Sequence, residues 1–69
     1  MIFNLEGAEF IELIKLLKLL HLAQSGGHAK IMVEDGEIKL NGEVEYRKRA
    51  KLRPGDVVET SDKKITIEL

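Results

Sequence analysis

The densest group of residues that could do chemistry is the basic run RKRAKLR at residues 47–53. It holds five of the chain's eleven lysines and arginines. The rest of the chain has six basic and twelve acidic residues. This segregation creates a local positive potential even though the net charge is −1. Lysine and arginine bind phosphate, and arginine can do so through two parallel hydrogen bonds. The run therefore predicts a phosphate-binding surface. The alternative is a solvated loop that offsets the acidic remainder.

A second group follows Ser25, where a helix is predicted to begin. The Ser25 hydroxyl can accept a hydrogen bond from a free amide of the first turn. Gly26 and Gly27 come next, and each glycine in a helix costs about 1 kcal/mol relative to alanine. Two adjacent glycines therefore indicate that another backbone or a phosphate approaches the helix closely. Helix N-termini bind phosphate through their free amides. Lys30, one turn further along, would add a positive charge.

The sequence does not predict a catalytic or metal-binding site. There are no cysteines and only two histidines, His21 and His28, without the spacing of a zinc site or any nucleotide-binding glycine pattern. Ser25 precedes His28 by three residues, but nothing supplies an oriented base and an oxyanion hole. The histidines are expected at the end of one helix and the start of another. We therefore expect no enzyme activity, no metal and no cofactor.

Length and composition set further bounds. A chain of 69 residues leaves room for one domain, which we expect to span residues 1–69. With 43% hydrophobic and 33% charged residues it is too apolar to be disordered. Residues 1–8 carry no basic region typical of a signal peptide. The apolar stretch at 10–22 is interrupted by charges and is shorter than the about 20 residues of a membrane span. A cytoplasmic location without membrane contact is expected, with a monomer favoured.

The first half of the chain predicts a strand and two helices. Residues 1–5 indicate a short strand. Residues 9–22 indicate a helix, because apolar residues recur at positions 10, 13, 14, 17 and 20. The apolar arc of this helix is wider than one stripe, so the helix is either buried on two sides or meets a partner.

The second helix is expected at residues 26–35. It would place Ala29, Met32 and Val33 on one face, with Ile31 beside them. Gly36 would end it in a left-handed conformation.

Beyond Gly36 the hydrophobic period changes to two, which is typical of strands. Asn-Gly at 41–42 is a strong hairpin signal. A two-residue loop would place Leu40 opposite an acidic residue. A bulged three-residue loop would pair Leu40 with Val44 and Ile38 with Tyr46, apolar against apolar. We expect the bulged loop, because register follows the buried face.

The last third of the chain indicates a loop and a second hairpin. Residues 47–53 are expected as a loop, and Pro54 and Gly55 as the centre of a type II turn. Strands are expected at 56–60 and 64–69. The predicted fold class is α+β, with two helices on one side of a small antiparallel sheet of about four short strands.

Several blocks together resemble the S4 RNA-binding domain. They are SGGHAK at 25–30, NGE at 41–43, RKRAKL at 47–52 and PGDVV at 54–58. Each block is common alone, but their order and spacing are specific. The resemblance covers about residues 8–60 and extends to the small stand-alone S4-like proteins of bacteria. It implies an αL motif, formed by the two helices and the hairpin, and RNA binding without catalysis.

The resemblance also implies the target and the site. The target would be structured RNA, with ribosomal RNA as its class and ribosome assembly or translation as the process. Carried over by position, the RNA-binding residues are Ser25, Gly26, Gly27, His28, Lys30, Lys39, Arg47, Lys48, Arg49, Lys51 and Arg53. Single-stranded readout needs aromatic stacking platforms. Phe3, Phe10 and Tyr46 are all expected in the core, so we expect recognition of RNA shape.

Two alternatives stay open. Two short helices followed by a hairpin also fit a winged helix-turn-helix, which binds DNA. Against it, Gly26, Gly27 and Ala29 stand where base-reading side chains would be needed. The other alternative is a protein-interaction module that uses the wide apolar face of the first helix, for example through Ile11, Leu16 and Leu19.

Overall fold

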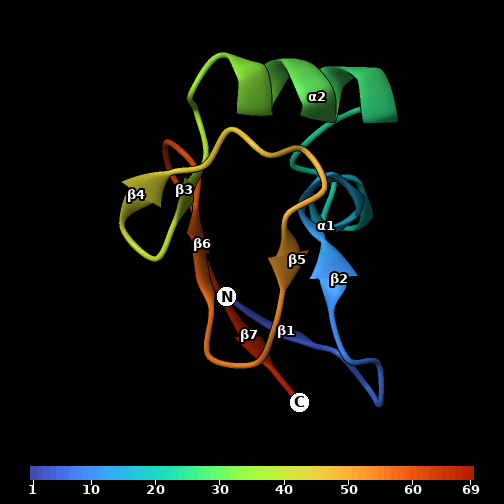
Figure 1. Ribbon diagram of the computed structural model, residues 1–69. Coiled ribbons are helices and arrows are strands. Elements are labelled where there is room, and N and C mark those ends of the chain that lie inside the picture. The colour runs from blue at the N-terminus through green and yellow to red at the C-terminus, as the bar shows by residue number, and fades with distance from the viewer.

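The computed structural model describes all residues from 1 to 69, in seven strands and two helices (Figure 1). The main sheet has five strands in the order β1 (Ile2–Asn4), β7 (Lys64–Glu68), β6 (Val57–Glu59), β3 (Lys39–Leu40) and β4 (Glu43–Val44). A separate two-stranded ribbon joins β2 (Ile11–Glu12) to β5 (Lys51–Leu52). The helices are α1 (Leu13–Leu19) and α2 (Gly26–Glu34).

The predicted α+β class is confirmed, and the sheet differs from expectation in two details. It has five strands rather than about four. It is also mixed, because β1 runs parallel to β7 while the other pairs are antiparallel. The strand predicted at residues 1–5 is therefore an edge strand held against the last strand of the chain.

The core consists of 15 buried residues, all hydrophobic. Its fully buried large side chains are Leu13, Leu16, Leu17, Val33, Ile38, Leu52, Val58, Ile65 and Ile67. They come from both helices, the ribbon and the main sheet, so one core joins all layers. The wide apolar arc of α1 is buried on two sides, because Leu16 lies within this core. Leu19 remains 53% exposed.

The first helix is shorter than predicted. It starts at Leu13, because residues 11 and 12 are extended and pair with β5. The Leu13 amide donates to the Ala50 carbonyl oxygen at 2.9 Å, which satisfies one of the free N–H groups at the helix start. The helix ends at Leu19, and His21 takes a left-handed conformation with φ 58°. A local apolar stripe could not reveal a strand partner about 40 residues away.

The second helix confirms its predicted signals. Ser25 is the N-cap, and its hydroxyl oxygen accepts a hydrogen bond from the His28 amide at 3.1 Å. Gly36 ends the helix with φ 75°. The expected close approach of another backbone is not found. A Cβ placed on Gly26 would meet only the Lys18 side chain, at the ordinary distance of 3.7 Å.

The predicted bulged hairpin is wrong. Leu40 pairs with Glu43, and Lys39 pairs with Val44, so the loop has two residues. Its residues Asn41 and Gly42 both have positive φ, at 53° and 90°, which gives the turn whose twist matches the strands. Turn geometry therefore outweighed apolar pairing here.

The same register leaves Tyr46, a predicted core residue, on the surface. It is 63% exposed. Its ring lies beside Gly36, where a Cβ would meet the Tyr46 hydroxyl at 3.2 Å.

The Pro-Gly turn has the predicted form. The Asp56 amide donates to the Arg53 carbonyl oxygen at 3.0 Å, and Gly55 has φ 96°, as a type II turn requires. Strands β6 and β7 follow where strands were expected. Neither helix has the length and apolarity that crossing a bilayer requires.

Candidate nucleic-acid interface

Residues 47–53, here called the basic segment, are tied to the rest of the protein at both ends. The first part crosses the start of α1, where the carbonyl oxygens of Lys48 and Ala50 accept hydrogen bonds from two helix amides. The last part is not the predicted loop, because Lys51 and Leu52 form β5 and pair with β2. This pairing buries Leu52 fully and leaves Lys51 exposed. The core therefore fixes where the cations lie.

Arg47 is paired with the carboxylate two residues before it. Its Nε and Nη2 atoms donate to the two Glu45 oxygens, both at 3.0 Å. Its backbone amide donates to the same carboxylate at 2.9 Å. These hydrogen bonds, with the side-chain bond foremost, hold the pKa of Glu45 below its usual value. Arg47 therefore has a carboxylate partner within the protein, which competes with phosphate for its guanidinium group.

Lys48 is also paired. Its Nζ atom lies 3.1 Å from the carboxylate of Glu34, the last residue of α2. Both side chains are partly exposed, so this ion pair adds little stability but still competes with phosphate.

The remaining cations of the basic segment are in no salt bridge. Arg49 and Lys51, together with Arg47 and Ala50, line an open hollow of about 380 Å³. Three cations around one concave surface form an arrangement that can bind a phosphate group. Of the predicted residues, this hollow unites Arg47, Arg49 and Lys51. Lys48 and Arg53 do not line it.

Lys51 and Arg53 share an aromatic neighbour. The Lys51 Nζ atom lies 4.9 Å from the centre of the Phe10 ring, and the Arg53 guanidinium carbon lies 5.5 Å from it. The β2–β5 register explains this arrangement. Glu12 faces Lys51, and residue 10 is one step from Ile11, which faces Leu52. Alternate residues point to opposite faces, so Phe10 and both cations lie on the outer face of the ribbon.

Phe10 is thus half-buried and in contact with cations, whereas its helical spacing predicted a core residue. The period-2 alternation of residues 10–12 is a signal for this placement. It is too short to be distinguished from a helical stripe without knowledge of the partner strand.

Asp56 positions the end of the basic segment. One carboxylate oxygen accepts a hydrogen bond from the Arg53 amide at 2.8 Å, and the other accepts one from the Asn41 side chain at 3.1 Å. The Asn41 side chain in turn accepts a hydrogen bond from the Val57 amide at 2.8 Å. These contacts give the Asn-Gly and Pro-Gly-Asp blocks a shared structural role.

The start of α2 forms a separate group. Besides the Ser25 cap, His28 Nδ1 accepts a hydrogen bond from the Gln24 amide at 3.0 Å. Ser25 and His28 therefore fix their own backbone. They lie at the first turn of α2, whereas Lys48 meets Glu34 at its last residue, about 12 Å further along the helix axis.

The other two predicted cations lie elsewhere. Lys30 is exposed on α2. Lys39 is exposed on β3, opposite Val44 on one side and Glu59 on the other. Neither lines the hollow. No group of three or more histidine, cysteine, aspartate or glutamate side chains is arranged to hold a metal ion.

The fold and these blocks match a known family. A family model described as S4 domain matches residues 3–68. The chain belongs to the S4 domain family. The match covers both helices, the hairpin and the basic segment, so the expected S4-like fold is confirmed.

Two bacterial proteins are similar to this S4 domain over most of its length. A protein of Escherichia coli (strain K12) named "Putative RNA-binding protein YbcJ" is 37% identical over 56 residues, which are 81% of this chain and 80% of that protein. A YbcJ protein of Shigella flexneri, named as uncharacterized, matches with the same identity and coverage.

A solved structure resembles this S4 domain over nearly its whole length. The solution structure of E. coli YbcJ has a TM-score of 0.74 and 35% sequence identity, and the match covers 99% of this chain and 86% of that one. That structure is described as revealing an αL motif involved in RNA binding.

Proposed function

We propose that this S4 domain is a non-catalytic module that binds structured RNA through its basic segment. The observation that carries the proposal is the hollow where Arg47, Arg49 and Lys51 converge. Phosphate contacts from such cations supply most of the sequence-independent affinity for nucleic acids. The name of E. coli YbcJ and the αL motif of its structure support RNA as the ligand.

The N-terminus of α2 would provide a second phosphate contact. Ser25 and His28 hold the first turn in place, and Gly26 and Gly27 have no side chains that would cover its amides. Lys30 would add a positive charge on the same helix. In this proposal the hollow and the helix start contact successive parts of one RNA.

Ribosomal RNA is the proposed target class, in ribosome assembly or translation. This part of the proposal rests on the resemblance to S4 domains. A net charge of −1 predicts weak non-specific binding, so contact should be confined to the basic face.

The test measures RNA affinity across a range of salt concentrations for a ribosomal RNA hairpin. Replacing Arg47, Arg49 and Lys51 with alanine should reduce the slope of log affinity against log salt by about one unit for each phosphate that the variant no longer neutralises. The control replaces two exposed cations away from the basic segment, Lys63 in the β6–β7 turn and Lys64 at the start of β7, and the slopes are compared per charge removed. A slope that falls equally in both variants, or in neither, would refute the proposal. Duplex DNA of the same length serves as competitor, and equal competition would favour general duplex binding.

A further inference from the structure

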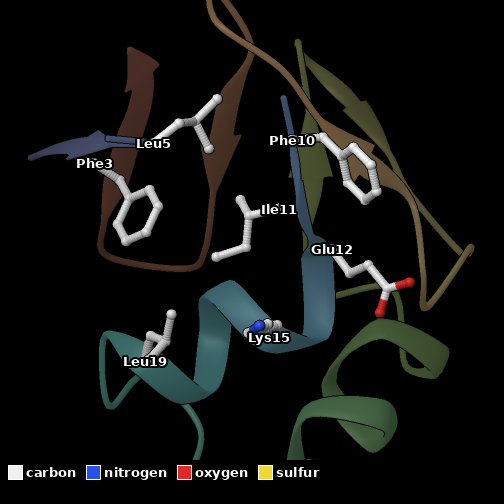
Figure 2. Close-up of a pocket in the computed structure, with 7 residues that line it drawn as sticks. All are labelled: Phe3, Leu5, Phe10, Ile11, Glu12, Lys15 and Leu19. Atoms are coloured by element: carbon white, nitrogen blue, oxygen red, sulfur yellow. The ribbon is translucent and has the colours of Figure 1, made fainter. Parts of the chain in front are cut away.

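A groove of about 400 Å³ lies beside β2 (Figure 2). Its apolar walls include Phe3 next to β7, Leu5, and Leu19 on α1. Strand β2 pairs only with β5, and no residue of β5 lines the groove, so it opens at the other edge of β2. Figure 2 shows Phe3, Leu5, Ile11 and Leu19 on one side of β2 and Phe10 on the other. The groove therefore follows the free edge of β2, with Phe10 on one wall and Phe3, Leu5 and Leu19 on the other.

Lysine and arginine side chains lie on both sides of the groove. Lys51 and Arg53 contact Phe10 from the β5 side. Lys15 lines the groove itself, and Lys15 and Leu19 also line an adjoining hollow with Lys18. An apolar surface between two cationic rims matches a nucleotide in an RNA chain, where a flat base lies between two phosphates.

The groove has one acidic lining residue, and its charge distinguishes between classes of ligand. Glu12 lines it on the same side of β2 as Phe10. A carboxylate accepts hydrogen bonds from the amino groups of adenine, guanine or cytosine. It would repel an acidic peptide, and the lysines and arginine around the groove would repel a basic one.

The groove is also continuous with the proposed RNA-binding surface. Lys51 lines the phosphate-binding hollow with Arg49 and contacts Phe10, which lines the groove. An RNA backbone that follows Arg49, Lys51 and Arg53 therefore passes along the groove edge. We propose that the groove binds one unpaired nucleobase of the RNA held by the basic segment. This inference rests on the proposed RNA binding and adds a substrate class to it: RNA with a bulged or looped nucleotide.

The experiment compares two hairpin RNAs that differ only in one bulged 2-aminopurine nucleotide in the stem. The protein should bind the bulged hairpin about tenfold more tightly, because stacking a base on an aromatic surface has an effect of this size. The fluorescence of 2-aminopurine should fall on binding, since stacking quenches it. Perfect duplex should still bind, with the salt dependence of phosphate contacts.

Two variants test the groove itself. Leu19→Ser changes an exposed wall residue, and Phe10→Leu keeps an apolar side chain while removing the ring. Each should lose the preference for the bulged hairpin, and Leu19→Ser should leave binding of the perfect duplex unchanged. Phe10 contacts Lys51 and Arg53, so Phe10→Leu is judged by the ratio of its affinities for the two RNAs. Ile31→Ser is the matched control, because Ile31 on α2 is 55% exposed and lies outside the groove. Circular dichroism checks that each variant is folded.

The outcomes separate this inference from the proposed function. Equal binding of the two RNAs by the unaltered protein would overturn the groove proposal and leave phosphate binding standing. The same holds if the groove variants keep the preference or weaken both RNAs equally. Failure to bind either RNA would overturn both proposals. If an acidic amphipathic peptide, and not the bulged RNA, shifts the NMR signals of Leu19 and Phe3, the groove is a protein site and the nucleobase proposal is wrong.

Discussion

The two halves of the basic segment carry similar charge in different surroundings. In the first half, Arg47 and Lys48 each have a carboxylate partner, at 3.0 Å and 3.1 Å. In the second half, Lys51 and Arg53 have an aromatic ring as neighbour and no salt bridge. Arg49 lies between them, also without a salt bridge, and lines the hollow.

This difference shows that a count of cations overstates the capacity to bind phosphate. A paired cation must first exchange its carboxylate for the phosphate, so part of the attraction is lost. A cation over an aromatic ring keeps most of its charge available, because the ring is neutral. We therefore expect the second half of the segment to dominate RNA binding.

The largest effect is expected in the salt dependence of RNA binding, measured for two double variants. Arg49→Ala with Lys51→Ala should reduce the salt-dependence slope of RNA binding by about two units, because each neutralised phosphate accounts for about one. Arg47→Ala with Lys48→Ala should reduce it by less than half as much. Affinity measured from 50 to 200 mM salt checks this. Equal slopes for the two variants would mean that the carboxylate partners do not matter.

The start of α2 is a third region of the proposed interface. Unlike the basic segment, its polar side chains form hydrogen bonds with their own backbone. Ser25→Ala should lower the free energy of unfolding by about 1 kcal/mol through loss of the cap. Ser25→Asp should retain the cap and place a negative charge where we propose a phosphate. Urea unfolding and RNA affinity are measured for both. RNA affinity unchanged in Ser25→Asp would remove this region from the interface.

Removing the carboxylate partners of Arg47 and Lys48 should make the first half of the basic segment bind phosphate as the second half does. Glu45→Gln and Glu34→Gln each remove the charge that competes with phosphate, so RNA affinity should rise about threefold and the salt slope should steepen by up to about one unit. The matched control is Glu37→Gln, which removes an exposed acid that is in no salt bridge. A gain as large in the control would assign the effect to net charge alone.

The smallest expected effect is a pH dependence of stability at Glu45. Folding lowers the pKa of this carboxyl, so its contribution is fully present above the unfolded pKa, which is about 4.3. It should disappear as the pH falls through the lower folded value. The urea midpoint of the unaltered protein should exceed that of Glu45→Gln at pH 7, and the difference should shrink as the pH falls below the unfolded pKa. A constant difference across this range would contradict the assignment.

The sequence predicted best where local chemistry decides the structure. The Ser25 cap, the left-handed Gly36 and the type II turn at Pro54 and Gly55 each depend on a few neighbouring residues. All three are present as expected. Ser25 and the Pro54–Gly55 turn belong to the blocks on which the S4 resemblance rests, which explains why the fold class was also correct.

Prediction failed where a distant partner decides. Residues 10–12 fit a helical stripe, yet they extend because β5 offers a partner strand and the Ala50 carbonyl accepts the Leu13 amide. That change moved Phe10 from the core to the outer face of the ribbon. The hairpin register failed for another reason, since the Asn-Gly turn geometry outweighed apolar pairing and left Tyr46 exposed. The pairing of Lys48 with Glu34 also needed three-dimensional placement, whereas Glu45 lies only two residues from Arg47 in the sequence.

Because β1 pairs with β7, the first strand of the chain cannot join the sheet until the last strand has been synthesised. Ile2 lies opposite Thr66, and the amino group of Met1 donates to the Lys64 carbonyl oxygen at 3.1 Å. A ribosome adds roughly 5–20 residues per second, so β1 is synthesised roughly 3–12 s before β7. During that time its apolar residues have no strand partner. Its length of only three residues limits the edge that the nascent chain offers to other unfolded chains.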